Sequence, residues 1–211
     1  MVRWGGVGLG RVRCGKDHKL QGETKMKQIS IEVEGTAPLL MHSAENMEEQ
    51  KGTKNPAKNY DPKIDAEKVV YKNDKGELFV PSRCLKASLL NASSWYKFGK
   101  KSAKPIIAGC TRIEPYEIIL LNKDNKPIKE YVIDKRPVVI QRSRIIRARP
   151  RIDKWKLKFE LVYDERVVGS SVDIIQNCLE EAGLRIGILD NRPQKYGENG
   201  TFKVTKFLPK Q

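Results

Sequence analysis

The sequence predicts an α+β fold in which an antiparallel sheet carries two helices on one face. Three observations lead to this prediction. Two segments, 27–34 and 154–163, alternate apolar and polar residues, which is the period of a half-buried strand. Two others, 82–96 and 171–182, place apolar residues at helical spacing. With further strands at 111–121 and 184–208, the order becomes βαββαβ, the ferredoxin-like or RRM-like plan.

The strand predictions depend on which residues face the core. In the first strand Ile29, Ile31 and Val33 fall on one face. The segment 154–163 is the most regular: Trp155, Leu157, Phe159 and Leu161 alternate with Lys154, Lys156, Lys158 and Glu160. The last strand, 184–208, is expected to contain a loop at 190–201. Residues 129–140 read as a further strand after a turn at 122–127.

The two helices are predicted from their starts and their stripes. Ser82 is expected to cap the first, whose core stripe is Leu85, Leu89, Ala92 and Tyr96. Arg83, Lys86 and Lys97 then project about 120° away from that stripe. Ser170 and Asp173 form a possible capping box for the second helix, whose stripe is Ile174, Ile175, Cys178, Leu179 and Ala182. Gly183 is the expected C′ residue.

The remaining segments read as a leader and two insertions. Residues 1–25 are glycine-rich and basic without periodicity, and we expect a disordered basic leader. Residues 26–211 form one domain with insertions at about 43–76 and 122–152. Within the first insertion we expect a short helix at 39–49 and a polar loop at 50–66. Segments 68–71 and 77–80 flank a turn and read as a hairpin.

A basic ribbon, Lys135–Arg151, forms most of the second insertion. It contains seven cations and no acid, and Pro137 and Pro150 make a continuous helix unfavourable. On an extended strand Arg144, Ile146 and Ala148 point one way, and Arg147, Arg149 and Arg151 point the other. Six of the seven cations are arginine, whose planar fork suits phosphate. The ribbon therefore reads either as a solvated hairpin or as a projecting finger that follows a phosphate backbone. Pairing of these arginines with carboxylates of their own chain would remove the argument for phosphate.

Composition narrows the class of partner. The 211 residues carry a formal net charge of +15 and a pI of about 9.7, which favours nucleic acid over a neutral partner. The sequence has no apolar run near the ~20 residues needed to cross a bilayer and no signal peptide, so we expect a cytoplasmic protein without a membrane partner. The four cysteines form no CxxC pair and only two histidines are present, so no metal or cofactor is expected.

Two motifs resemble those of a known family. Leu78–Leu89 (LFVPSRCLKASL) resembles a conserved segment of the RAMP superfamily, whose members form the backbone of CRISPR effector complexes. Gly183–Phe202 is similar to the glycine-rich loop near the C-terminus of that family. Gly35–His42 (GTAPLLMH) and the 183–202 segment also resemble small phage and prophage proteins of the same build. The resemblance extends from Met26 to Leu208.

The resemblance implies a protein that binds RNA or single-stranded DNA without catalysis. The strand would lie across the sheet and helix, the hairpin would act as a thumb between neighbours, and subunits would form a homo-oligomer or filament. Combining the family with the charge pattern, we expect nucleic-acid contacts from arginines, lysines and one tyrosine. These are Arg83, Lys86, Lys97, Arg136, Arg142, Arg144, Arg147, Arg149, Arg151, Arg192, Lys195 and Tyr196.

Several alternatives remain open at this point. Tyr196 stacks on a base or packs on the sheet edge, and the loop 190–201 is a ligand contact or a plain hairpin connection. The protein could instead be a phage structural or assembly protein with a basic interaction surface. Some relatives are endoribonucleases, which would need a general base and acid such as His42, Asp61 or Asp65. We expect His42 to be structural and the protein not to be an enzyme.

Overall fold

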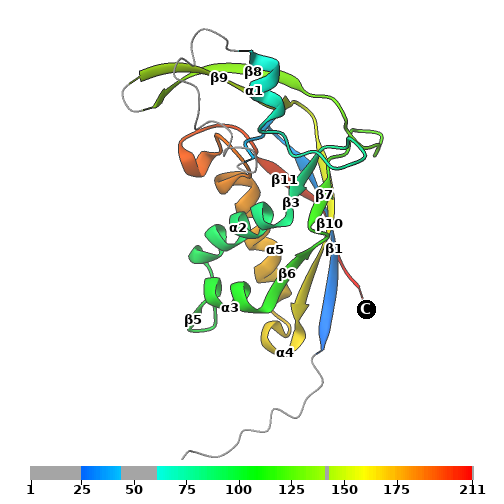
Figure 1. Ribbon diagram of the computed structural model, residues 1–211. Helices are drawn as coiled ribbons and strands as arrows, with labels where there is room; N and C mark the ends of the chain where they lie inside the picture. The colour runs from blue at the N-terminus through cyan, green and yellow to red at the C-terminus, as the bar shows by residue number, and fades with distance from the viewer. Residues whose placement is uncertain (1–24, 44–60, 141–142, 211) are drawn as a thin grey trace, which may run out of the picture.

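The main sheet has four antiparallel strands in the order β11-β1-β10-β6. The computed structural model describes residues 25–43, 61–140 and 143–210, and within these ranges the side chains of all but residues 138–145. The strands are β1 (Met26–Gly35), β6 (Thr111–Glu114), β10 (Lys156–Asp164) and β11 (Phe202–Pro209). Together with helices α2 (Ser82–Ala92) and α5 (Val172–Glu181) they give the predicted βαββαβ plan, which is confirmed (Figure 1).

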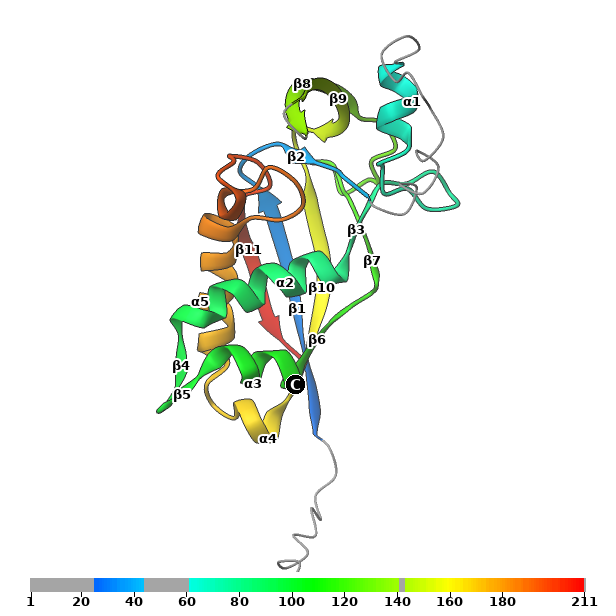
Figure 2. The same ribbon diagram turned by 60° about the vertical axis from the view of Figure 1, so that its left-hand side comes forward.

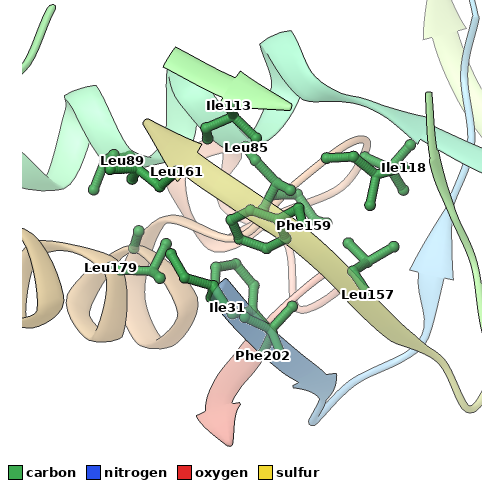
Figure 3. Packing of buried hydrophobic residues seen from close by; sticks show 14 of the residues in the cluster. Ile31, Leu85, Leu89, Ile113, Ile118, Leu157, Phe159, Leu161, Leu179 and Phe202 are labelled. Atoms are coloured by element: carbon green, nitrogen blue, oxygen red, sulfur yellow. The ribbon is translucent and has the colours of Figure 1, made fainter. Parts of the chain in front are cut away.

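The register of the sheet explains the core. Ile29, Ile31 and Val33 of β1 pair with Leu161, Phe159 and Leu157 of β10, and all six side chains are buried. Figure 3 shows how Leu85 and Leu89 of α2 and Leu179 of α5 meet the same face. Alternation at period two therefore predicted the buried face of both central strands correctly.

A small lobe between α2 and β6 was not predicted. The chain leaves α2 through a 3₁₀ turn η2 (Ser93–Trp95), forms a two-stranded hairpin from β4 (Lys97–Phe98) and β5 (Lys101–Ser102), and enters helix α3 (Ala103–Cys110). Pro105 is accommodated because it lies in the first turn of α3, where its missing N–H has no intrahelical acceptor to lose. Ala103 and Ile107 anchor α3 to the core.

Two predicted strands are shorter or paired differently. The strand expected at 111–121 is interrupted at Pro115, and β7 (Glu117–Ile119) pairs with β3 (Phe79–Pro81) in a separate ladder. The hairpin predicted from 68–71 and 77–80 is present. Lys72 and Leu78 form an antiparallel bridge, and the backbone N–H groups of Asn73 and Phe79 donate to the carbonyls of Glu77 and Tyr71 in the opposite arm.

The C-terminal end of α5 corrects two predictions. The strand expected at 184–189 is wrong: residues Ala182–Ile186 continue the helix as a π-turn, η3. Gly183 is therefore not the C′ residue; Gly187, with φ of 71°, follows the last turn. Gly183 serves a close approach, because an added Cβ would lie 2.2 Å from the carbonyl oxygen of Phe202. At the other end of α5 the cap is Ser171 rather than Ser170, and it makes no side-chain cap bond.

The second insertion forms the predicted projecting hairpin, β8 (Val132–Ile140) and β9 (Ser143–Ile152) (Figure 1). Short strand β2 (Leu39–Leu40) pairs with β9, so the helix predicted at 39–49 is wrong over its described residues. Helix α1 (Pro62–Glu67), capped by Asp61, occupies part of the predicted polar loop and lies beside the hairpin. A last short helix, α4 (Glu165–Val168), follows β10. Over the described residues, the structure contains no helix long and apolar enough to cross a membrane.

Candidate nucleic-acid interface

The hairpin register gathers the basic ribbon on one face. Arg136 lies opposite Arg147, Asp134 opposite Arg149, and Val132 opposite Arg151. Directly opposed residues in an antiparallel pair share a face, so these four arginines lie on the same side of the hairpin. Ala148 and Pro150, on the other side, are buried. The predicted separation of faces is therefore correct for residues 147–151.

Every arginine on this face contacts an aspartate of the same chain. Arg136 Nε lies 2.6 Å from Asp134, Arg147 NH1 lies 3.2 Å from Asp65, Arg149 NH1 lies 2.5 Å from Asp190, and Arg151 Nε lies 2.9 Å from Asp153. Pairing with carboxylates of the same chain was the condition that removes the argument for phosphate, and it is met by all four described arginine side chains, because acids come from outside the ribbon and from its edges. Arg142 lies outside the described residues, as does the side chain of Arg144.

Two of these contacts, Arg147 with Asp65 and Arg149 with Asp190, fasten the base of the hairpin to the body. Asp65 comes from α1 and also accepts a hydrogen bond from the backbone N–H of Ala148 at 2.9 Å. Asp190 comes from the loop that precedes β11, and its N–H donates to the carbonyl of Leu40. The arginine side chains are 21–50% exposed, so the pairs are partly shielded from solvent.

The outer face of the sheet gives no support to the predicted sheet contact. Glu32 pairs with Lys158 and Lys206 at 3.2 and 3.4 Å, and Glu34 pairs with Lys203 at 3.1 Å. Lys210 pairs with Glu160. Its charges are thus balanced within the described strands. A shallow hollow of about 540 Å³ on this face is lined by Ser30, Glu114, Pro115, Lys158, Phe159 and Glu160.

Lys86 does not belong to a surface track. Its ammonium donates to the carbonyls of Ile107 (2.7 Å) and Thr111 (2.5 Å) and to the Thr111 hydroxyl (2.5 Å), so it caps the C-terminal end of α3. Burial lowers the pKa of Lys86 to about 8. The helical period placed this side chain away from the core stripe correctly, but α3 covers that side of α2. The prediction that Lys86 contacts nucleic acid is withdrawn for this reason.

The other two cations predicted on this helix face solvent. Arg83, at the start of α2, is exposed, and a hydrogen bond with Tyr71 raises the pKa of its guanidinium. Lys97, in β4, is also exposed. The two stand at opposite ends of α2 and η2, so the helix separates them rather than bringing them together (Figure 2).

The glycine-rich loop, residues 187–201, is a tightly bonded turn. Backbone N–H groups of Lys195 and Gly197 both donate to the carbonyl of Arg192, and that of Asn199 donates to Asn191. An added Cβ on Gly197 would lie 2.0 Å from the carbonyl oxygen of Asn191, and one on Gly200 would lie 2.1 Å from that of Ile188. From the sequence we expected these two glycines to let a nucleic-acid backbone approach closely. In the structure their missing side chains allow the loop to pack against itself.

The same turn presents Tyr196 to solvent. The side chain is 103% exposed, and its backbone is left-handed with φ of 61°, a conformation that costs a non-glycine residue about 1 kcal/mol. It does not pack on the sheet edge. Arg192 donates from NH1 to the carbonyl of Leu189 (2.7 Å) and from Nε to Gln194, so it braces the loop from within. Lys195 is exposed beside the tyrosine.

Side-chain contacts join the loop to α2 and to the hairpin. Gln194 accepts a long hydrogen bond, 3.5 Å, from Asn91 of α2, and Asp190 pairs with Arg149 of the hairpin. The structure thus brings the ribbon base, the loop and α2 together on one end of the sheet. Of the predicted contacts, Arg147, Arg149, Arg192, Lys195 and Tyr196 belong to this assembly.

His42 is a site residue whose surroundings the sequence reasoning missed. It follows β2, and the charged groups of Arg149, Asp190, Arg147 and Asp65 all act on it. Burial, and then the positive charge of Arg149, holds the pKa of its imidazole below the ordinary 6.5. Nothing in the local sequence signals this setting, because its four charged neighbours come from three distant segments. Within the described residues no group of histidine, cysteine and acid side chains is arranged to hold a metal ion.

Comparisons with known proteins support the fold. No family model matches the chain, and no curated protein matches it. Among solved structures, the chain is similar to a chain of the Type III-B Cmr-beta complex bound to cognate target RNA, with a TM-score of 0.59 and 12% sequence identity. The match covers 88% of this chain and 61% of that one, so this protein spans less than two thirds of its structural neighbour. At this level of identity the similarity concerns the fold alone.

Proposed function

We propose that this protein binds single-stranded nucleic acid, RNA in the first place, without sequence preference and without cleaving it. The observation that carries the proposal is the presentation of Tyr196. A fully exposed aromatic ring, held in a strained left-handed conformation on a rigidly bonded turn beside Lys195, contributes nothing visible to packing. Strained residues of this kind cluster at functional sites, and an exposed ring beside a cation is a stacking platform for a base.

The exposed side of α2 continues the surface from this loop. Arg83, Ala87 and Asn91 follow one another at a spacing of four residues, and Asn91 contacts the loop through Gln194. Helix α2 contains no acidic residue. A strand that stacks on Tyr196 therefore meets a helix surface with one cation, Arg83, at its start and no carboxylate of α2 to repel phosphate.

The hairpin has two parts in this proposal. Its base is held to the body by the contacts of Arg147 with Asp65 and of Arg149 with Asp190, and the second of these orients the loop. The distal part, beyond residues 136 and 147, projects from the body and is the element that would reach a neighbouring subunit when copies assemble along a strand. Similarity of fold to a chain of an RNA-bound complex supports this arrangement, and so does the net charge of +15.

The proposal is tested by fluorescence anisotropy with labelled oligo-U and oligo-dT of increasing length. Wild-type protein should bind both, with affinity that falls steeply between 50 and 200 mM salt and rises with length, the salt dependence following counterion release. Tyr196→Gly should weaken binding about 5- to 100-fold, the equivalent of ~1–3 kcal/mol for one stacked base. The same change should not lower the melting temperature, because glycine accepts the left-handed backbone.

A matched control removes charge from the balanced sheet face. Lys203→Gln with Lys206→Gln should leave binding within about twofold, since both lysines are held by Glu34 and Glu32. Equal loss in the control and in Tyr196→Gly would contradict the assignment of the loop. Absence of any length dependence in the wild-type protein would favour the alternative of a phage structural or assembly protein with a basic surface.

RNA cleavage is the second candidate, and the setting of His42 favours testing it. An imidazole with a lowered pKa beside two arginines has the composition of a general base next to phosphate ligands. Asp61 and Asp65 are already engaged, the first as the cap of α1 and the second with Arg147 and the N–H of Ala148. End-labelled RNA incubated with excess protein should stay intact over hours; products that vanish in His42→Gln would establish the second candidate instead.

A further inference from the structure

The lobe formed by η2, β4, β5 and the start of α3 has a surface unlike the rest of the molecule. Gly99 and Lys100 form the two-residue turn between β4 and β5, and Gly99 has φ of 58°, as the first position of a tight hairpin turn requires. The lobe lies at the far end of α2 and η2 from the start of the helix, and both views place it away from the β8–β9 hairpin (Figure 2). We name residues Trp95–Lys104 the basic tip.

The basic tip carries uncompensated positive charge. Its four lysines, Lys97, Lys100, Lys101 and Lys104, are all exposed, and none pairs with an acid among the described residues. The chain from Arg83 to Lys104 contains no acid at all. Glu180 and Glu181 of α5 act on Tyr96, but they are engaged with Gln176 and Arg185. This differs from the ribbon, where each described arginine side chain has an aspartate.

The three aromatic residues of the tip differ in how far they are buried. Tyr96 and Phe98 are half-buried and pack against the core, which fixes the hairpin on the body. Trp95 is left out of that packing and is 56% exposed. Single exposed apolar residues are common on protein surfaces. Trp95, however, has the largest side chain of any amino acid, and it belongs to the same short segment as the four unpaired lysines. An exposed indole beside cations is the combination used to bind unpaired bases and their phosphates.

We propose that the basic tip is a second contact for single-stranded nucleic acid, with Trp95 stacking on a base and the lysines meeting phosphates. This inference rests on the proposed function and extends it, because it assigns a contact at the opposite end of α2 from Arg83. Lysine supplies a flexible point charge with no fixed geometry, which suits contacts that do not depend on sequence. A strand engaged by the loop and by the tip is held at two places, so affinity should step upward once an oligonucleotide is long enough to span both.

An acidic protein is the competing occupant, and the observations favour nucleic acid. A protein partner gains most of its affinity from an apolar anchor in a pocket. Two hollows among the described residues, one on the outer face of the sheet and one beside Trp155, are lined by no residue of the tip. Trp95 is 56% exposed, which fits a ring that stacks on a base better than an anchor held in a pocket.

Intrinsic fluorescence tests the stacking directly. The chain has three tryptophans: Trp4 lies outside the described residues, and Trp155 is buried with its indole N–H donating to the carbonyl of Ala37. In full-length Trp4→Phe protein, added oligo-U should quench the exposed component of the emission, which belongs to Trp95. The quench should disappear in Trp4→Phe, Trp95→Phe protein, whose remaining emission comes from Trp155. Binding without any quench would overturn the stacking role.

The phosphate contacts of the tip lysines are tested by neutralising three of them, with a matched set of three lysines elsewhere on the chain as the control. Replacing Lys97, Lys100 and Lys101 with Gln removes three proposed phosphate contacts. Since each contact contributes ~0.7 to the slope of log affinity against log salt for a single strand, that slope should become less steep by about 2. The control changes Lys123, Lys126 and Lys129 to Gln, three exposed lysines of the turn between β7 and β8 where Asp124 and Glu130 already offset them. Equal effects of the two triples would mean that total charge acts, not the tip.

The outcomes separate this inference from the proposed function. If the tip triple changes long-strand binding but leaves short-strand binding intact, both proposals stand. If the tip triple has no effect while Tyr196→Gly weakens binding, the second contact is refuted and the proposed function survives. If the tip triple abolishes binding and Tyr196→Gly does not, the tip stands and the loop assignment fails. Retention of an acidic polypeptide such as poly-glutamate, with no binding of oligonucleotide, would refute both.

Discussion

Replacing Lys86 by methionine separates a structural cation from a nucleic-acid contact. Methionine keeps most of the stem volume and removes the ammonium that caps α3. Three acceptors lose their donor: the carbonyl oxygens of Ile107 and Thr111 and the Thr111 hydroxyl. The carbonyl of Ile107 still accepts from that hydroxyl at 2.7 Å, so one backbone carbonyl, that of Thr111, loses the most.

The magnitude follows from these contacts. A hydrogen bond to a charged group contributes about 1.5–3 kcal/mol, and three bonds that share one nitrogen do not add independently. The cost of keeping a half-buried ammonium charged offsets part of the gain. We expect a net loss of about 2 kcal/mol, which for a chain of this size lowers the melting temperature by about 4–8 °C. Thermal unfolding followed by circular dichroism at pH 7 measures it.

The pH dependence gives a second readout with a fixed sign. The folded pKa of about 8 is below the ordinary value of 10.5, so between these two pH values the unfolded chain binds more protons at Lys86 than the folded chain does. Stability of the wild-type protein should therefore rise with pH through this window, relative to Lys86→Met. Lys97→Met, an exposed lysine of the same basic run, is the control and should change neither quantity. An unchanged melting temperature in Lys86→Met, together with weaker oligonucleotide binding, would refute the capping role.

Three further predictions concern the core, the hairpin anchor and a buried thiol. Gly183→Ala should lower the free energy of unfolding by at least ~2 kcal/mol, because the added Cβ would lie 2.2 Å from the carbonyl oxygen of Phe202. Gly109→Ala is the control: its Cβ would have no atom within 4 Å, so the change should be neutral or stabilising. Urea unfolding compares the two variants. Asp65→Asn should lower the free energy of unfolding by about 1–3 kcal/mol, because the ion pair with Arg147 is lost. Asp61→Asn is the control and should change little, since asparagine caps a helix as well as aspartate does. Equal melting temperatures of the two variants would contradict the role of Asp65 as an anchor. Burial raises the pKa of the Cys178 thiol to about 12, so iodoacetamide at pH 8 should label this thiol only after denaturation, and mass spectrometry of the native protein detects any earlier labelling. Because the folded pKa is above the ordinary value, the contribution of Cys178 to stability should fall as pH rises above about 9.

Much of the fold was predictable because its signals are local. The alternation in 27–34 and 154–163 and the stripes of the two helices each depend on neighbours within one element. Errors came where tertiary contacts override the local pattern. Leu39 and Leu40 look like the start of a helix, yet they form a strand because β9 offers them a partner. The residues 184–189 are apolar enough for a strand, yet the π-turn uses them to close the helix over Phe202.

The candidate site was predictable only in part, for a physical reason. The sequence shows where cations are dense but not which acids reach them. Asp65 and Asp190 lie far from Arg147 and Arg149 along the chain, so no window of sequence reveals these pairs. Lys86 illustrates the same limit, since its position on the helix was correct but the covering helix α3 was not foreseen. Lys195 and Tyr196 stay predicted contacts. The structure shows both side chains exposed, which a short glycine-rich turn favours because it leaves few places for large side chains to go.

The aspartate contacts at the root of the hairpin affect how the protein can be truncated. Cutting out the whole finger would strand the carboxylates of Asp65 and Asp190, each without its counter-ion, on surfaces evolved to receive a cation. Such a deletion would confuse a loss of folding with a loss of ligand. A shortened finger that keeps residues 132–136 and 147–152 preserves the ion pairs with Asp65 and Asp190 and removes only the reach, which makes it the cleaner reagent for asking what the far end touches.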